Sequence, residues 1–200
     1  MMFVNIKQSL VFVVWVLVSL LSACSSLDVI PDGAYSRAAL ENLSPLAKWS
    51  LEGRLSLSGS KDSWAANLLW DHDPSQDRLK LSGPLGQGAT LIRLNGDLVS
   101  IDHGDGKVQT SVQPEIFINQ QLGMSIPIMA LKYWIVGLPE PGKAFVDMVS
   151  GFSQSGWLIE YKQMQLASNR SLPRKMTVMN EKVKLKLIVE QWVINGTDGH

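Results

Sequence analysis

Residue types that commonly do chemistry are sparse in this 200-residue chain. Its histidines are His72, His103 and His200, and none is spaced from another His or Cys as zinc ligands are. Asp71 and Asp73 could hold a cation, although Asp-His-Asp-Pro is more typical of a turn. No serine lies in a Gly-x-Ser-x-Gly motif, and no glycine-rich segment has the Walker pattern. The sequence therefore predicts a protein that is not an enzyme and that holds no metal or cofactor.

The single cysteine, Cys24, is the residue with the clearest chemistry. It follows Leu21-Ser22-Ala23, at the end of an apolar stretch that begins after Lys7. The order aliphatic, small, small, cysteine resembles the lipobox of bacterial lipoproteins. There the thiol takes a diacylglycerol, and cleavage before the cysteine frees its amine for a further acyl chain. We therefore expect residues 1–23 to be a lipoprotein signal peptide and Cys24 to carry covalent N-acyl and S-diacylglycerol lipid.

Two other interpretations of this N-terminus stay open at the level of sequence. The apolar stretch could be a retained membrane anchor, but a spanning helix needs roughly 20 apolar residues, whereas a signal peptide needs ~7–15. Cys24 could also be an unpaired thiol, which in an exported protein would need an explanation. Lipidation supplies one, and two or more acyl chains anchor a protein stably. Ser25, rather than Asp, follows the cysteine, which by resemblance to known sorting rules favours the outer membrane.

The composition fits one neutral globular domain. The chain has 18 Lys plus Arg, 18 Asp plus Glu and 46% hydrophobic residues. Zero net charge argues against nucleic-acid binding, and the apolar fraction is too high for a disordered chain. We expect a lipidated N-terminus and tether over 24–46, one domain over 47–194, and a frayed C-terminus over 195–200.

Period-two alternation dominates the sequence after the tether. From Trp49 to Ser58, apolar residues face one way and polar residues the other, which is typical of a half-buried antiparallel strand. Similar short segments, separated by turn signals such as Asn95-Gly96, predict a sandwich or barrel. We predict a turn over 71–75 and strands over 49–58, 63–71, 78–82, 89–95, 97–103, 107–112, 156–163, 174–179 and 182–191, with a weaker candidate over 145–149.

Two short helices are predicted between these groups of strands. Pro114 and Glu115 are typical of a first helical turn, and Gly123 can end that helix. Pro127 begins a second helix, which Gly137 ends. The sequence therefore indicates a mainly β fold with a few short helices.

An apolar residue stands at the tip of one predicted loop. Pro84, Leu85 and Gly86 directly follow a strand, and the surrounding Pro and Gly residues force a turn that exposes Leu85. The leucine could pack back onto its own strand or dip into a bilayer.

Several short motifs are similar, in order and spacing, to those of the LolB family of outer-membrane lipoprotein receptors. Together they span residues 45–192, and the Pro-Leu-Gly loop and the segment 134–139 are the most specific of them. The motifs are Trp49, Gly53-Arg54, Trp70, Leu81-Ser82-Gly83-Pro84-Leu85-Gly86, Leu122-Gly123, Ile126-Pro127, Leu131, Trp134 and Gly137-Leu138-Pro139.

The resemblance implies a LolA/LolB-like fold, a half-open antiparallel β-barrel of about eleven strands whose helices cover an apolar cavity. It also implies a monomer that takes acylated lipoprotein cargo from the periplasmic carrier LolA and inserts it into the inner leaflet of the outer membrane. Pro84, Leu85 and Gly86 would then form a membrane-insertion loop. The partners would be LolA, the lipoprotein cargo and outer-membrane lipid, and the location would be the periplasmic face of that membrane.

The predicted cavity residues come from the inward side of the alternating strands and of the second helix. They are Trp49, Leu51, Leu55, Leu57, Trp70, Ile128, Leu131, Trp134 and Ile135. Taken singly, each of them fits ordinary core packing better than a cavity wall. The main alternative function is a structural or assembly lipoprotein of the cell envelope that uses its apolar face as a protein interface.

Overall fold

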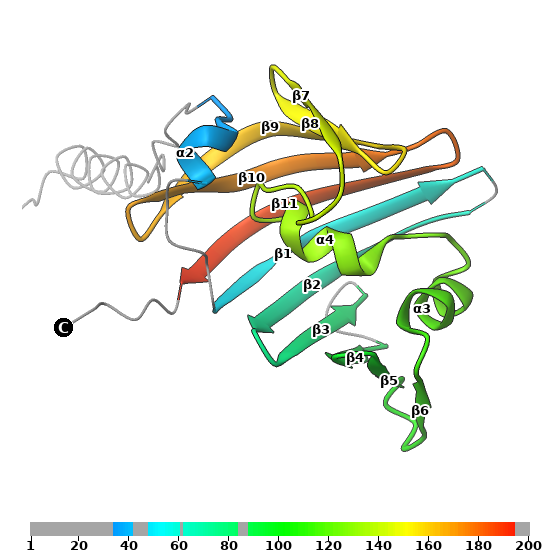
Figure 1. Cartoon of the computed structure of the whole chain (residues 1–200). Coiled ribbons are helices and arrows are strands. Elements are labelled where there is room, and N and C mark those ends of the chain that lie inside the picture. Colours follow the sequence, from blue (N-terminus) through cyan, green and yellow to red (C-terminus); the bar gives the residue numbers. More distant parts are fainter. Residues whose placement is uncertain (1–33, 42–47, 61, 84–87, 195–200) are drawn as a thin grey trace, which may run out of the picture.

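The computed structural model describes residues 34–41, 48–60, 62–83 and 88–194. Within these ranges the chain forms one sheet and three helices (Figure 1). The helices are α2 (Arg37–Glu41), α3 (Pro114–Leu122) and α4 (Ile128–Trp134). The strands are β1 (Trp49–Gly59), β2 (Ser63–Asp73), β3 (Gln76–Ser82), β4 (Thr90–Asn95), β5 (Leu98–Asp102), β6 (Val108–Ser111), β7 (Phe145–Met148), β8 (Gly151–Gln154), β9 (Trp157–Ala167), β10 (Arg170–Met179) and β11 (Val183–Ile194).

All eleven strands belong to one antiparallel sheet in the order β6-β5-β4-β3-β2-β1-β11-β10-β9-β8-β7. Every neighbouring pair is also adjacent in sequence except β1 and β11, which join the two halves of the sheet through their full length. The edge strands β6 and β7 do not pair with each other, so the barrel is open on that side. This confirms the predicted half-open antiparallel sheet of eleven strands with a few short helices.

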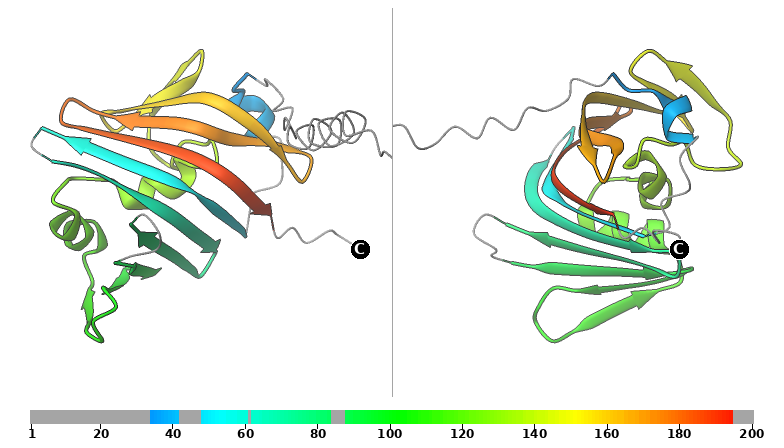
Figure 2. Two further views of the ribbon diagram at one scale, coloured as in Figure 1. Left: turned by 180° about the vertical axis from the view of Figure 1, so that it is seen from behind. Right: turned by 90° about the vertical axis from the view of Figure 1, so that its left-hand side faces the viewer.

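The position of α3 and α4 follows from this topology. The chain that links edge strand β6 to edge strand β7 contains both helices, so it must cross the open side of the sheet. Figure 2 shows the sheet curving around α4. Pro114 begins α3, and Gly123 ends it in the left-handed conformation with φ 68°, as the sequence predicts.

The alternation on the long strands decides which side chains face these helices. On β1, Leu51, Leu55 and Leu57 are buried, whereas Glu52 and Arg54 between them are exposed. The same alternation recurs on β11. A register shift opposite Gly53 bends this pair of strands, and a Cβ there would collide with the backbone of Ile188. Glycine therefore lets β1 and β11 approach each other where the sheet curls.

Two local features differ from the predictions, and one weaker prediction is confirmed. β2 continues through Asp73, so the turn expected over 71–75 is shorter, because β2 and β3 pair up to Asp73 and Gln76. The weaker candidate over 145–149 is a strand, β7, and β8 after it was not predicted. Only four residues long, β8 has no clear alternation of its own and is formed by pairing with β7 and β9.

Candidate functional site

An apolar pocket lies between the curved sheet and the two helices that cross it. Strands β1, β2, β3, β4 and β11 form its floor, and α3, α4 and the segment between them form its cover. Its lining contains no charged or hydrogen-bonding group except the Trp indoles. The lining residues are Leu55, Trp64, Leu68, Trp70, Leu79, Leu81, Ile92, Ile118, Leu122, Ile126, Ile128, Leu131, Ile135, Leu185 and Leu187.

The space left between these side chains is small. It amounts to about 30 Å³, which is roughly the room that one water molecule needs. A dry space of this kind, walled by Leu, Ile and Trp, favours an apolar occupant over water. An acyl chain does not fit until the cover moves or the side chains repack.

Five of the nine predicted cavity residues line this pocket. Leu55 and Trp70 come from the floor, and Ile128, Leu131 and Ile135 come from the cover. The pocket therefore contains residues that are far apart in the sequence. Alternation on the strands and the 3.6-residue period on α4 place them on inward faces.

The other four predicted residues are buried, but they do not line the pocket. Trp49 packs against Trp70 and Trp192, with ring centroids 5.6 Å apart in both pairs. Trp134 donates its indole N–H to Gln154 Oε1 at 2.7 Å. Leu51 and Leu57 lie on the same strand face as Leu55. Alternation cannot tell which inward residue lies beneath a helix, because it carries no information on the position of the cover.

Ten lining residues were not among the predicted cavity residues. Leu68, Leu185 and Leu187 stand on inward faces of alternating segments, so a signal for burial was present. Nothing in the sequence pairs them with Ile118 or Ile126, which approach from the opposite side of the pocket.

The C-terminal end of α4 is held to the sheet by hydrogen bonds. The Tyr161 hydroxyl on β9 donates to the Trp134 carbonyl at 2.6 Å. Burial raises the pKa of the Tyr161 hydroxyl well above its usual range, so it stays protonated and donates. Gln154 accepts from the Trp134 indole and donates to the backbone carbonyls of Glu140 and Lys143. These bonds fix one end of the cover.

Comparison with known proteins identifies the family. A sequence model described as "Outer membrane lipoprotein LolB" matches residues 47–192. The chain belongs to the LolB family. It is 36% identical to the outer-membrane lipoprotein LolB of Chromohalobacter salexigens, over 88% of this chain and 87% of that protein. It is 33% identical to the protein of the same name from Marinomonas sp., over 88% of this chain and 93% of the other.

A solved structure is similar to the fold of this LolB-family chain. It is a LolA superfamily protein from Nitrosomonas europaea, with a TM-score of 0.50 and 6% sequence identity. The match covers 79% of this chain and 90% of the other. At that identity the likeness concerns the fold alone.

Residues 34–41 of this LolB-family chain fall in the range expected to be a tether, yet they contact the domain. Tyr35 stacks on Tyr161, with ring centroids 4.3 Å apart, and donates its hydroxyl to the Gly137 carbonyl at 2.9 Å. Leu40 is buried, and its side chain occupies the space that a Cβ on Gly137 would need. Gly137 also has φ 93°, a backbone conformation that favours glycine. Arg37 donates two hydrogen bonds of 2.7 Å to the Asp147 carboxylate. We call residues Tyr35–Glu41 the strap.

Two of the three histidines have structural partners in the LolB-family fold. His72 Nδ1 lies 2.7 Å from Asp77 Oδ1, which also accepts from the Trp70 indole at 2.9 Å. His103 contacts Thr90 and Gln121. Among the described residues, no group of three or more His, Cys, Asp or Glu side chains is placed to hold a metal ion. No helix in the same part of the chain is long and apolar enough to cross a membrane.

The predicted lipid anchor Cys24 and the predicted insertion loop Pro84, Leu85 and Gly86 lie outside the described residues. The same is true of the signal peptide 1–23 and of residues 195–200. Their roles stay predictions.

Proposed function

We infer that this chain is an outer-membrane lipoprotein receptor that accepts acylated lipoproteins and inserts them into the inner leaflet of the outer membrane. Membership of the LolB family gives the class of protein. The observation that carries the inference is the pocket beneath α3 and α4, whose floor and cover are both apolar. Such a pocket suits acyl chains and offers nothing to a charged or polar substrate.

The physics of lipid transfer explains why a covered pocket is needed. Each buried CH₂ group of an acyl chain contributes about 0.8 kcal/mol, so release of several chains into water would be very slow. The sequence has no Walker motif, so the transfer we propose runs downhill. The carrier then holds the cargo more weakly than this protein does, and the membrane takes it last.

The small volume of the pocket indicates a closed state of the receptor. About 30 Å³ is free, so cargo enters only when α3 and α4 move away from the sheet. Leu, Ile and Trp side chains distinguish acyl chains only by their bulk and shape, which predicts weak selectivity among lipoproteins.

The proposed partners are the periplasmic carrier LolA, acylated lipoprotein cargo and outer-membrane lipid. The proposed anchor is the acylated Cys24, which would hold a monomer on the periplasmic face of the outer membrane. The role is transport and involves no enzymatic step.

A transfer assay tests this function. The full chain, in lipid vesicles, is mixed with LolA that carries a fluorescent lipoprotein, and movement of the label to the vesicles is measured. We expect the label to reach the vesicles only when this chain is present. If the chain forms a stable complex with an envelope protein but takes up no acylated lipoprotein, the assembly-lipoprotein alternative is correct instead.

A further inference from the structure

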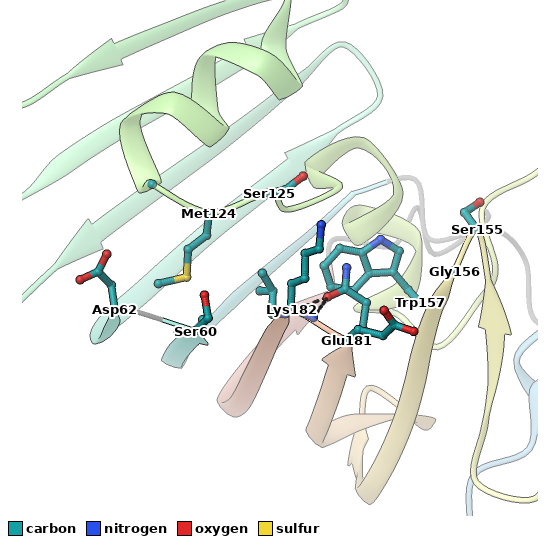
Figure 3. A pocket seen from close by; sticks show the side chains of 13 residues that line it. Ser60, Asp62, Met124, Ser125, Ser155, Gly156, Trp157, Glu181 and Lys182 are labelled. Carbon is teal, nitrogen blue, oxygen red and sulfur yellow. Dashed lines mark hydrogen bonds between the residues drawn. The ribbon is translucent and has the colours of Figure 1, made fainter.

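A second hollow opens at one end of the half-barrel, beside the apolar pocket (Figure 3). Its volume is about 660 Å³. Four segments form it: the β1–β2 turn, the segment after α3, the β8–β9 turn and the β10–β11 turn. We call it the polar port, and it is lined by Gly59, Ser60, Asp62, Gly123, Met124, Ser125, Ser155, Gly156, Trp157, Asn180, Glu181, Lys182 and Val183.

The floor of the polar port continues into the apolar pocket. Val183 lines the port, and Leu185, the next residue on the same face of β11, lines the pocket. Residues two apart on a strand are separated by roughly 7 Å. On β1, Gly59 lines the port and Leu55 lines the pocket. The two spaces are therefore neighbours on one sheet surface.

Met124 and Ile126 form the partition between the two spaces. Met124 lines the port and is 8% exposed, whereas Ile126 lines the pocket. A Cβ on Gly59 would be 3.4 Å from the Met124 sulfur, so the missing side chain at Gly59 leaves room for the methionine. Figure 3 shows Met124 extending from the cover toward the β1–β2 turn. Methionine is unbranched and adapts readily to a new neighbour.

The partition stands in the segment between α3 and α4. In the part of the chain that the structure describes, no hydrogen bond joins residues 123–127 to a strand. The opposite end of α4 is bonded to Tyr161 and Gln154. Gln121 of α3 is bonded to Gln109 on β6. The segment between the two helices is therefore the part of the cover with the fewest bonds to the sheet, and its outward movement would join the port to the pocket.

The port offers several hydrogen-bonding groups, whereas the pocket offers only its Trp indoles. Ser60, Ser125 and Ser155 carry hydroxyls, Lys182 is a donor, and Glu181 is an acceptor. An acylated lipoprotein likewise has an apolar part and a polar part in one molecule. Its acyl chains are apolar, whereas its glycerol esters and first peptide groups need hydrogen bonds.

We propose that the polar port holds the glyceryl-cysteine head and first residues of the cargo lipoprotein, while its acyl chains pass Met124 into the apolar pocket. This inference rests on the proposed function and adds a binding site to it. β3 runs antiparallel to β2, toward the port end of that strand, and its last residue, Ser82, pairs with Asn67, the fifth residue of β2. The chain that leads into the predicted insertion loop therefore leaves β3 in the direction of the port.

Site-specific photo-crosslinking tests the port. A photo-reactive residue replaces Ser125 in the full chain, and a matched variant carries it at Ser75, an exposed serine in the turn between β2 and β3 at the other end of the sheet. The probe is a triacylated lipopeptide, with the same peptide without acyl chains as a control. We expect an adduct on the peptide part of the lipopeptide at Ser125, little at Ser75, and none with the unacylated peptide.

A gating variant gives an independent readout. Met124→Trp enlarges the partition and should slow lipopeptide uptake several-fold, whereas Met124→Leu should not. Thermal unfolding of both variants reports whether they fold.

Different outcomes overturn different parts of the argument. If lipopeptide uptake is absent in the unmodified chain, the proposed function fails. If uptake is normal but Ser125 gives no more adduct than Ser75, or an adduct with phospholipid only, the port assignment alone is wrong. Normal uptake by a folded Met124→Trp variant would show that cargo takes another path.

Discussion

The Tyr161 hydroxyl lies 2.6 Å from the backbone carbonyl oxygen of Trp134, to which it donates. Tyr161 belongs to β9 and Trp134 is the last residue of α4, so this bond joins the sheet to the cover of the pocket. The aromatic ring of Tyr161 also stacks on Tyr35 of the strap. One tyrosine thus connects the strap, the sheet and the cover.

Removal of this hydroxyl should destabilise the protein. Tyr161→Phe removes a buried hydrogen bond, although the Trp134 carbonyl still accepts from the Gly137 N–H at 3.0 Å, so we expect a loss of about 0.5–1.5 kcal/mol of unfolding free energy. Urea denaturation measures the loss. Tyr133→Phe on α4 is the matched control, since no hydrogen bond from the Tyr133 hydroxyl exists among the described residues. Equal losses for the two variants would contradict the role assigned to the Tyr161 bond.

The strap should contribute a similar amount to the unfolding free energy. Tyr35→Phe removes a partly buried hydrogen bond to Gly137 and keeps the stacking on Tyr161, so we expect a loss of about 0.5–1.5 kcal/mol. Hydrogen exchange should show faster opening at the end of α4 while the β1–β11 pair stays protected. Uniform acceleration across the sheet would mean that the strap does not act locally.

Acid should weaken the contact between the strap and β7. The hydrogen bond from Arg37 lowers the pKa of the Asp147 carboxyl in the folded protein. The stabilisation is therefore present above the unfolded pKa of about 3.9 and is lost as the pH falls through the lower folded value. Asp147→Asn should remove this part of the pH dependence of thermal unfolding between pH 5 and pH 2. An unchanged profile would indicate that the ion pair adds nothing in solution.

Substitution of two buried leucines can distinguish a lipid-binding pocket from ordinary core packing. Leu131→Ala enlarges the pocket, and Leu172→Ala removes an equally buried leucine elsewhere in the core. Each should cost about 2–5 kcal/mol of unfolding free energy. Only Leu131→Ala should also change the affinity for a fluorescent fatty acid, measured by titration. If both variants change that affinity alike, the pocket is not the binding site.

Leu85→Glu tests the predicted insertion loop. A charge at the tip should leave lipoprotein binding intact but reduce its deposition in vesicles, because a carboxylate resists entry into a bilayer. The control is Leu98→Glu, which alters an exposed leucine at the start of β5, at the other end of the sheet. Deposition at the normal rate by Leu85→Glu would refute the loop hypothesis.

The sequence by itself determined the class of fold and the inward faces of the long strands. Alternation such as Leu51, Leu55 and Leu57 on β1 is a local signal, since side chains on a strand point to opposite faces in turn. Pro114 and Gly123 marked the ends of α3 for an equally local reason, the backbone angles that each residue allows. Short β8 had no such signal.

Only the tertiary structure decided which inward residues form the pocket. Leu55 lies beneath the cover and Leu57, two residues along the same face, does not line the pocket, although their sequence signals are the same. Likewise, only packing brings Tyr35 to Tyr161 and Met124 to Gly59. These contacts depend on where the chain between β6 and β7 crosses the open side of the sheet. The periodicity of a single strand or helix shows which of its faces points inward, but it does not show which other element packs against that face.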